Sequence, residues 1–219
     1  MTKQFIIRSG SVPSDSILPK FNDVFPSLVA PNKRKFTDLF DGAADALNGR
    51  RVPVAPAAQQ QSWSATAVVV LDGAGGIRTQ TVSTGDARAL IDAGSAGSQG
   101  EWGATFVAGS VGAFGLLLRQ ANSNQEGWRA VFRSNGQFSV QKTTTSGGVV
   151  PGAGIDVPFA YVPGVTYTVR AVVEGAGVTV YVNGVRLAVA AGVDLASNTR
   201  AGIYFRDSDA VCLEFVGGS

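Results

Sequence analysis

The chain has no histidine, and Cys212 is the single cysteine among its 219 residues. Without histidine there is no imidazole to act as a general base, to complete a Ser-His-Asp triad or to ligate a metal ion. One cysteine excludes both a disulfide within the chain and a zinc site built from several thiolates. These absences remove the commonest catalytic arrangements, so the sequence favours a protein that is not an enzyme.

Strong charge and long apolar runs are also missing. Charged residues make up 16% of the chain and the net charge is +2. The short basic runs at 33–35 and 50–51 lack interleaved aromatic residues, so we expect solvated segments and no nucleic-acid partner. No segment is long and apolar enough to span a membrane, and the N-terminal apolar run is too short for a signal peptide. We therefore expect synthesis in the cytoplasm without membrane insertion.

What the chain does contain is apolar residues interrupted by glycine. Hydrophobic residues reach 45%, and there are 28 glycines. This composition is too apolar for a disordered protein and too rich in glycine for a helical bundle.

Residues 1–34 form a segment of their own, because Pro13, Pro19, Pro26 and Pro31 recur through it. Proline donates no amide hydrogen bond, so this segment is neither a long helix nor a central strand. We interpret it as an extended arm, which either docks on a partner or wraps back onto its own domain. The apolar residues expected to make an assembly contact are Phe5, Ile6, Ile7, Ile17, Leu18, Phe21 and Phe25.

From Trp63 onward, short β-type runs alternate with Gly, Ser and Asn clusters, which predicts an antiparallel sandwich or barrel. The predicted strands cover residues 64–71, 77–83, 102–108, 114–120, 128–133, 137–143, 167–174, 178–183, 185–190, 200–206 and 210–216. Two segments have helical character. Residues 36–48 place apolar side chains at helical spacing, although Gly42 interrupts them, and residues 87–93 are short enough to be a strand instead.

The order of several motifs is more specific than any one of them. The first motif covers residues 38–50 and is followed by Trp63. The next motifs cover residues 115–119, 128–132 and 138–142. The hairpin pattern 166–173 and 178–185, which contains Asn183-Gly184, and the segment 199–203 complete the series. This series resembles concanavalin-like and laminin-G-like jelly-roll domains, particularly those of tailed-bacteriophage virion structural proteins, over residues 36–217.

The resemblance implies an all-β, antiparallel two-sheet jelly-roll sandwich over residues 35–219, preceded by the arm at 1–34. Under it, residues 86–93 become a strand. The alternation of Val178, Val180 and Val182 with Thr179 and Tyr181 independently suits a strand that buries one face.

Candidate functional residues are few. Glycosidases of this fold pair two carboxylates, and none of the four glutamates here has an acidic partner two to four residues away. Asp207 and Asp209 are candidate calcium ligands, with a solvated turn as the alternative. Trp63, Trp102 and Trp128 are candidate glycan-stacking residues, with core packing as the alternative. Cys212, in an apolar strand, is expected to be a small buried hydrophobe.

The resemblance implies a non-enzymatic virion protein, either a capsid decoration or head fibre or a tail appendage. Its arm would anchor the jelly roll to other virion proteins, and a homo-oligomer is expected. The alternative is a carbohydrate-binding module that recognises a bacterial surface glycan. No cofactor is expected apart from the candidate calcium ion.

Overall fold

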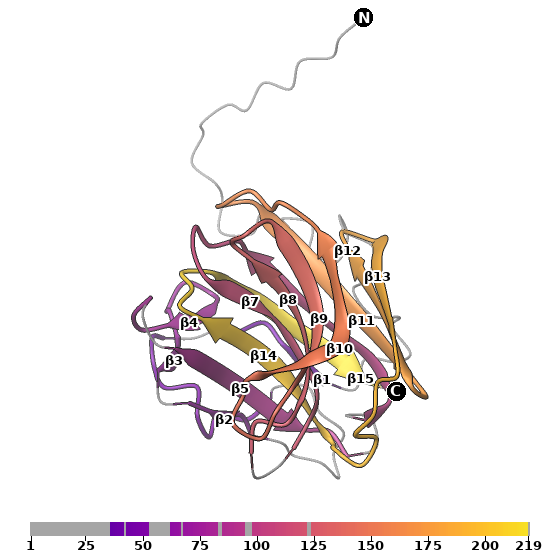
Figure 1. Ribbon diagram of the computed structural model, residues 1–219. Coiled ribbons are helices and arrows are strands. Elements are labelled where there is room, and N and C mark those ends of the chain that lie inside the picture. Colours follow the sequence, from indigo (N-terminus) through magenta and orange to yellow (C-terminus); the bar gives the residue numbers. More distant parts are fainter. Residues whose placement is uncertain are drawn as a thin grey trace, which may run out of the picture.

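Two antiparallel β-sheets lie face to face in the computed structural model, which describes residues 36–41, 43–52, 62–66, 68–82, 85–94, 98–121 and 124–218 (Figure 1). The eight-stranded sheet has the order β13-β12-β11-β6-β15-β4-β3, with β1 also paired to β15. The seven-stranded sheet has the order β10-β9-β8-β7-β14-β5-β2. The predicted all-β jelly-roll sandwich is therefore confirmed, while the arm at 1–34 lies outside the described residues.

The strands of the eight-stranded sheet come from all parts of the described chain. They are β1 (Phe36–Asp38), β3 (Val69–Leu71), β4 (Ile77–Thr79), β6 (Gly100–Val107), β11 (Thr166–Glu174), β12 (Gly177–Val182), β13 (Val185–Ala191) and β15 (Val211–Gly218). The β12–β13 turn has positive φ at both Asn183 (49°) and Gly184 (79°), as a type I′ hairpin requires.

In the seven-stranded sheet, four strands that follow one another in the chain lie side by side. Its strands are β2 (Ser64–Ala65), β5 (Asp86–Asp92), β7 (Ala113–Gln120), β8 (Gly127–Arg133), β9 (Gln137–Thr143), β10 (Val149–Pro158) and β14 (Arg200–Arg206). The sequence did not predict β10, because its prolines and glycines hide the strand pattern. The predicted single strand at 64–71 is wrong, since β2 and β3 belong to different sheets.

The helix suggested at 36–48 is also wrong. Phe36 pairs with Gly217 in β1, and Phe40 has a φ of 51°, which an α-helix does not allow. Phe36, Phe40 and Leu47 are buried while Leu39 is 54% exposed, so the four do not share one helical face. Packing of Phe36 and Phe40 into the sandwich outweighs the local periodicity. Residues 86–92 form β5, as the resemblance implied.

The core between the sheets is rich in aromatic rings. Trp63 and Trp102 both pack against Phe215, with ring centroids 5.3 and 5.6 Å apart. At the other end, Phe132 contacts Phe114 and Phe138 with centroids 5.0 Å apart. Such pairs add to the free energy gained by burying large apolar surfaces. Within the described residues, no helix is long and apolar enough to cross a membrane.

Candidate functional site

The outer face of the seven-stranded sheet, turned away from the core, carries the candidate site. Along β8, Trp128, Ala130 and Phe132 belong to the core, so Arg129, Val131 and Arg133 point to the other side. Along β14, Ala201, Ile203 and Phe205 likewise face the core, which turns Arg200, Gly202, Tyr204 and Arg206 outward. We call this surface the outer face.

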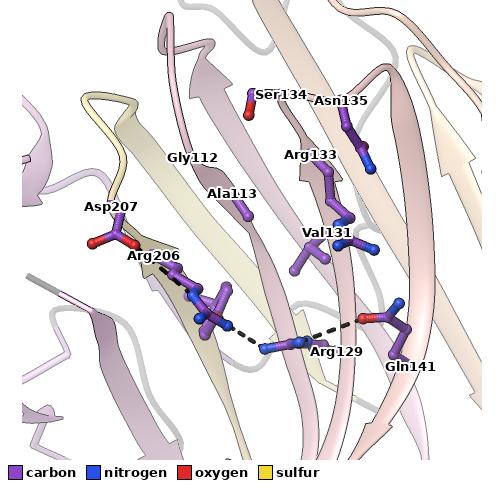
Figure 2. A pocket seen from close by; sticks show the side chains of 11 residues that line it. Gly112, Ala113, Arg129, Val131, Arg133, Ser134, Asn135, Gln141, Arg206 and Asp207 are labelled. Carbon is purple, nitrogen blue, oxygen red and sulfur yellow. Dashed lines mark hydrogen bonds and ion pairs between the residues drawn. The ribbon is translucent and has the colours of Figure 1, made fainter. Parts of the chain in front are cut away.

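A groove of about 310 Å³ lies on the outer face near the β8–β9 turn. Figure 2 shows Arg129, Arg133, Gln141, Arg206 and Asp207 around the same hollow. The groove is lined by Gly112, Ala113, Arg129, Val131, Arg133, Ser134, Asn135, Gln141, Tyr204, Arg206 and Asp207.

A chain of hydrogen bonds crosses the outer face through the groove. Arg129 donates from Nη1 to the Tyr204 hydroxyl (2.8 Å) and from Nη2 to Gln141 Oε1 (3.4 Å). The Tyr204 hydroxyl donates to Asp86 Oδ1 (2.7 Å), and Gln141 Nε2 donates to Asp156 Oδ1 (3.1 Å). These residues come from β5, β14, β8, β9 and β10, so the network spans most of the sheet.

The network keeps the Tyr204 hydroxyl protonated and holds the neighbouring side chains in position. Burial raises the pKa of Tyr204 far above its usual value, and the acceptor carboxylate of Asp86 adds to the rise although Arg129 opposes it. Tyr204 therefore remains a hydrogen-bond donor at physiological pH. The Arg129 guanidinium also lies over the Tyr204 ring, 5.0 Å from its centroid.

Among the described residues, three polar atoms of the outer face are buried without a hydrogen-bond partner, namely Arg129 Nε, Ser139 Oγ and Arg200 Nε. Ser139 lies beside Val131 on the neighbouring strand. A buried donor without a partner costs roughly 1–3 kcal/mol. Beside them, Leu90, Leu117, Val131 and Tyr204 form a separate apolar cluster on the outer face. Convergent polar groups next to an apolar strip are typical of a small-molecule site.

The three candidate stacking tryptophans do not belong to this site. Trp63, Trp102 and Trp128 are at most 1% exposed. The Trp63 indole donates to Asp38 Oδ2 (2.9 Å) and the Trp128 indole to Asp194 Oδ1 (3.1 Å). They pack in the core, which was the alternative interpretation, and their ring faces are not presented to a ligand.

The two candidate calcium ligands hold different loops instead. Asp209 accepts from the backbone N–H and the hydroxyl of Ser110, both at 2.7 Å, and Asp207 accepts from the Gly85 N–H at 3.0 Å. No group of three metal-ligating side chains occurs in the described part of the chain. Burial raises the pKa of Cys212 well above its usual value, as in an inert core thiol. The seven arm residues from Phe5 to Phe25 lie outside the described residues.

Sequence reasoning missed Arg129, Gln141 and Tyr204. The outward position of Arg129 could be inferred from its alternation with Trp128 and Ala130. The proximity of Arg129 to Tyr204 could not, because their strands are brought together only by the pairing of β7 with both β8 and β14.

Comparison with known proteins supports the fold assignment. The sequence matches no protein-family model, and no curated protein matches it. A carbohydrate-binding module, CBM66 from Bacillus subtilis, superposes with a TM-score of 0.55 at 16% identity, over 82% of this chain and 97% of that one. A Bacillus licheniformis β-glucanase superposes with a TM-score of 0.55 at 7% identity, over 81% and 99%. A Trypanosoma rangeli sialidase superposes with a TM-score of 0.58 at 12% identity. The match covers 86% of this chain and 31% of the sialidase. The chain therefore has a concanavalin-like jelly-roll fold, which occurs in both binding modules and glycosidases.

Proposed function

We propose that the protein binds a glycan in the groove of the outer face, without cleaving it. The observation that carries this proposal is the network from Asp86 to Asp156, whose central Arg129 keeps a buried Nε without a partner. Sugar hydroxyls donate and accept hydrogen bonds, so they suit a surface that offers fixed guanidinium, amide and phenol groups. The adjacent apolar strip suits the C–H surface of a sugar ring.

The arrangement of acids argues against hydrolysis. Asp207 is the one acid among the lining residues of the groove. The Arg206 Nε lies 3.6 Å from Asp86 Oδ1 and 3.9 Å from Asp207 Oδ2, so both carboxylates are ion-paired with the same guanidinium. Asp86 and Asp156 lie on β5 and β10, which are separated by four strands of the sheet, and the side chains of Tyr204, Arg129 and Gln141 lie between their carboxylates. Glycosidase carboxylates are roughly 5–10 Å apart, with the scissile bond between them.

A glycan array probed with the full chain, followed by calorimetry on the strongest ligand, tests the proposal. Gln141→Ala and Asn135→Ala remove neutral polar groups from the groove, and we expect each to weaken binding about tenfold. Gln80→Ala, an exposed change near β4 on the other sheet, is the matched control. The proposal fails if no glycan binds, or if Gln80→Ala weakens binding as much as the groove variants. Release of reducing sugar from the bound ligand would contradict the absence of hydrolysis.

The role as a virion structural protein rests on the sequence resemblance and stays a prediction. In that role the arm at 1–34 would anchor the domain to capsid or tail proteins, and the glycan-binding face would point outward from the virion. The solution mass of the full chain beside that of residues 35–219 tests the arm. A defined oligomer that becomes a folded monomer on truncation supports assembly through the arm, and two monomers would oppose self-assembly.

A further inference from the structure

A second cavity lies on the same outer face, toward the opposite end of β14. Its volume is about 210 Å³. It is lined by Ser64, Ala65, Thr66, Arg88, Leu90, Ala121, Asn124 and Arg200, and we call it the arginine pocket. Leu90 belongs to both the arginine pocket and the apolar cluster that also contains Val131 and Tyr204, residues of the groove. The two cavities are therefore linked by one apolar strip.

The two arginines of the arginine pocket come from neighbouring strands, Arg88 from β5 and Arg200 from β14. Within the described part of the chain, neither has an acidic group within 4.0 Å. Among the described residues, Arg200 Nε is buried without a hydrogen-bond partner, and the Arg88 side chain donates to the backbone carbonyl of Asn124 (3.3 Å) alone. The nearest acids are engaged elsewhere: Asp92 accepts from the Thr199 hydroxyl, and Asp86 from Tyr204.

Both arginines carry charge in this half-buried position. Burial lowers the pKa of Arg88, and the positive charge of Arg200 lowers it further, while Asp86 opposes the change. A guanidinium nevertheless stays protonated at physiological pH. Two neighbouring cations that form no ion pair with a described acid are unfavourable, and an anion bound between them relieves this cost.

The charge of the residues that line the two cavities supports the same conclusion. Five of the eleven arginines in the described residues line the groove or the arginine pocket: Arg88, Arg129, Arg133, Arg200 and Arg206. Arg133, which is partly exposed at the groove, has no ion pair with a described acid. The lining residues of the two cavities together include one carboxylate, that of Asp207.

We propose that the arginine pocket binds the anionic substituent of an acidic glycan whose neutral sugar units occupy the groove. This inference rests on the proposed function and names its ligand class. Arg88 and Arg200 would hold the oxyanion, whether carboxylate, sulfate or phosphate, with charge-assisted hydrogen bonds from their guanidinium N–H groups. The aspartates interspersed on the outer face, such as Asp86 and Asp156, disfavour the continuous phosphate backbone of a nucleic acid.

Matched pairs of acidic and neutral saccharides test the inference by calorimetry with the full chain. Oligogalacturonate is compared with its methyl ester, dextran sulfate with dextran, and a glycerol-phosphate polymer with glycerol oligomers. We expect the wild type to bind the acidic member of one pair at least tenfold more tightly, and that pair identifies the oxyanion. Arg200→Gln and Arg88→Gln should each remove this preference. Arg186→Gln, which loses the same charge from exposed β13 on the other sheet, should stay within twofold of the wild type.

The possible failures are distinguishable. Equal binding of acidic and neutral saccharides, still weakened by Gln141→Ala, overturns the arginine pocket and leaves the proposed function standing. Binding of none of these saccharides and of no array glycan overturns both. Tighter binding of a single-stranded oligonucleotide than of any acidic glycan also overturns the inference. If Arg200→Gln does not fold, Arg88→Gln and Arg200→Lys test the inference in its place. The lysine keeps the positive charge, so Arg200→Lys should keep a measurable preference for the acidic saccharide.

Discussion

Arg129 and Tyr204 are joined by a hydrogen bond of 2.8 Å although their strands, β8 and β14, are not neighbours in the sheet. Strand β7 lies between them, and at the position opposite Tyr204 it carries Gly115, which has no side chain. The two long side chains therefore meet above β7. This contact connects the two halves of the hydrogen-bond network and forms the floor of the groove.

Removing the Tyr204 hydroxyl tests the importance of this contact. Tyr204→Phe leaves the ring in place but deprives Arg129 of an acceptor and Asp86 of a donor. We expect the glycan affinity to fall about three- to tenfold and the free energy of unfolding to fall by about 1–2 kcal/mol. Calorimetry and urea denaturation measure the two effects. Tyr181→Phe, on the other sheet beneath Arg170, serves as the control. Unchanged affinity in Tyr204→Phe would show that the network does not shape the groove.

Arg119 is a buried cation that stabilises the end of the sandwich opposite the groove. It is 0% exposed and donates to the backbone carbonyls of Ser98, Val193, Asp194 and Gly175. Arg119→Met keeps the bulk but leaves these carbonyls without their donor. We expect a loss of about 3 kcal/mol or more in the free energy of unfolding, measured by urea denaturation. Arg78→Met, at the exposed position of β4, should change stability by less than about 0.5 kcal/mol. Similar losses in both variants would contradict a structural role for Arg119.

Gly202 permits the close pairing of β14 with β5 at the centre of the outer face. A Cβ atom at this position would lie 1.9 Å from the Ala89 carbonyl oxygen, and this backbone atom cannot move aside alone. We expect Gly202→Ala to destabilise the protein by about 3 kcal/mol or to prevent folding. In Gly148→Ala the new Cβ would meet nothing nearer than Thr144 Oγ1 at 3.4 Å, so its melting temperature should stay close to that of the wild type. Equal melting temperatures for both variants would refute the packing argument.

Asp209 gives the stability a defined pH dependence. Burial disfavours its carboxylate, but the hydrogen bonds from Ser110 and Val111 outweigh this and hold its pKa below the usual value. A group with a lowered folded-state pKa contributes stability above its unfolded pKa, about 3.9, and loses it as the pH falls through the folded value. Asp209→Asn should therefore lower the melting temperature near pH 7, and the difference from the wild type should shrink below about pH 4. The same difference near pH 7 and pH 2.5 would contradict this account.

Most strands could be predicted from the sequence, because the core of this fold is built from strands with alternating apolar side chains that are separated by turn residues. The predicted segments 137–143 and 200–206 coincide with β9 and β14, and the segment 128–133 matches β8 except for its first residue. The prediction from sequence failed at residues 36–48. There Phe40 packs in the core with a left-handed backbone conformation, and this packing outweighs the helical spacing of the apolar residues. The site could not be predicted for a different reason: Arg129 and Tyr204 are 75 residues apart in the chain, and only the strand order brings them together.

A titration of the labelled full chain with the strongest array glycan, followed by backbone NMR, tests the central claim most directly. We predict that the largest shift changes fall on β8, β9, β14 and β5, around Arg129, Gln141 and Tyr204, and extend to Arg88 and Arg200 when the glycan is acidic. Shift changes confined to the eight-stranded sheet, around β11, β12 and β13, would contradict the assignment of the outer face as the binding surface.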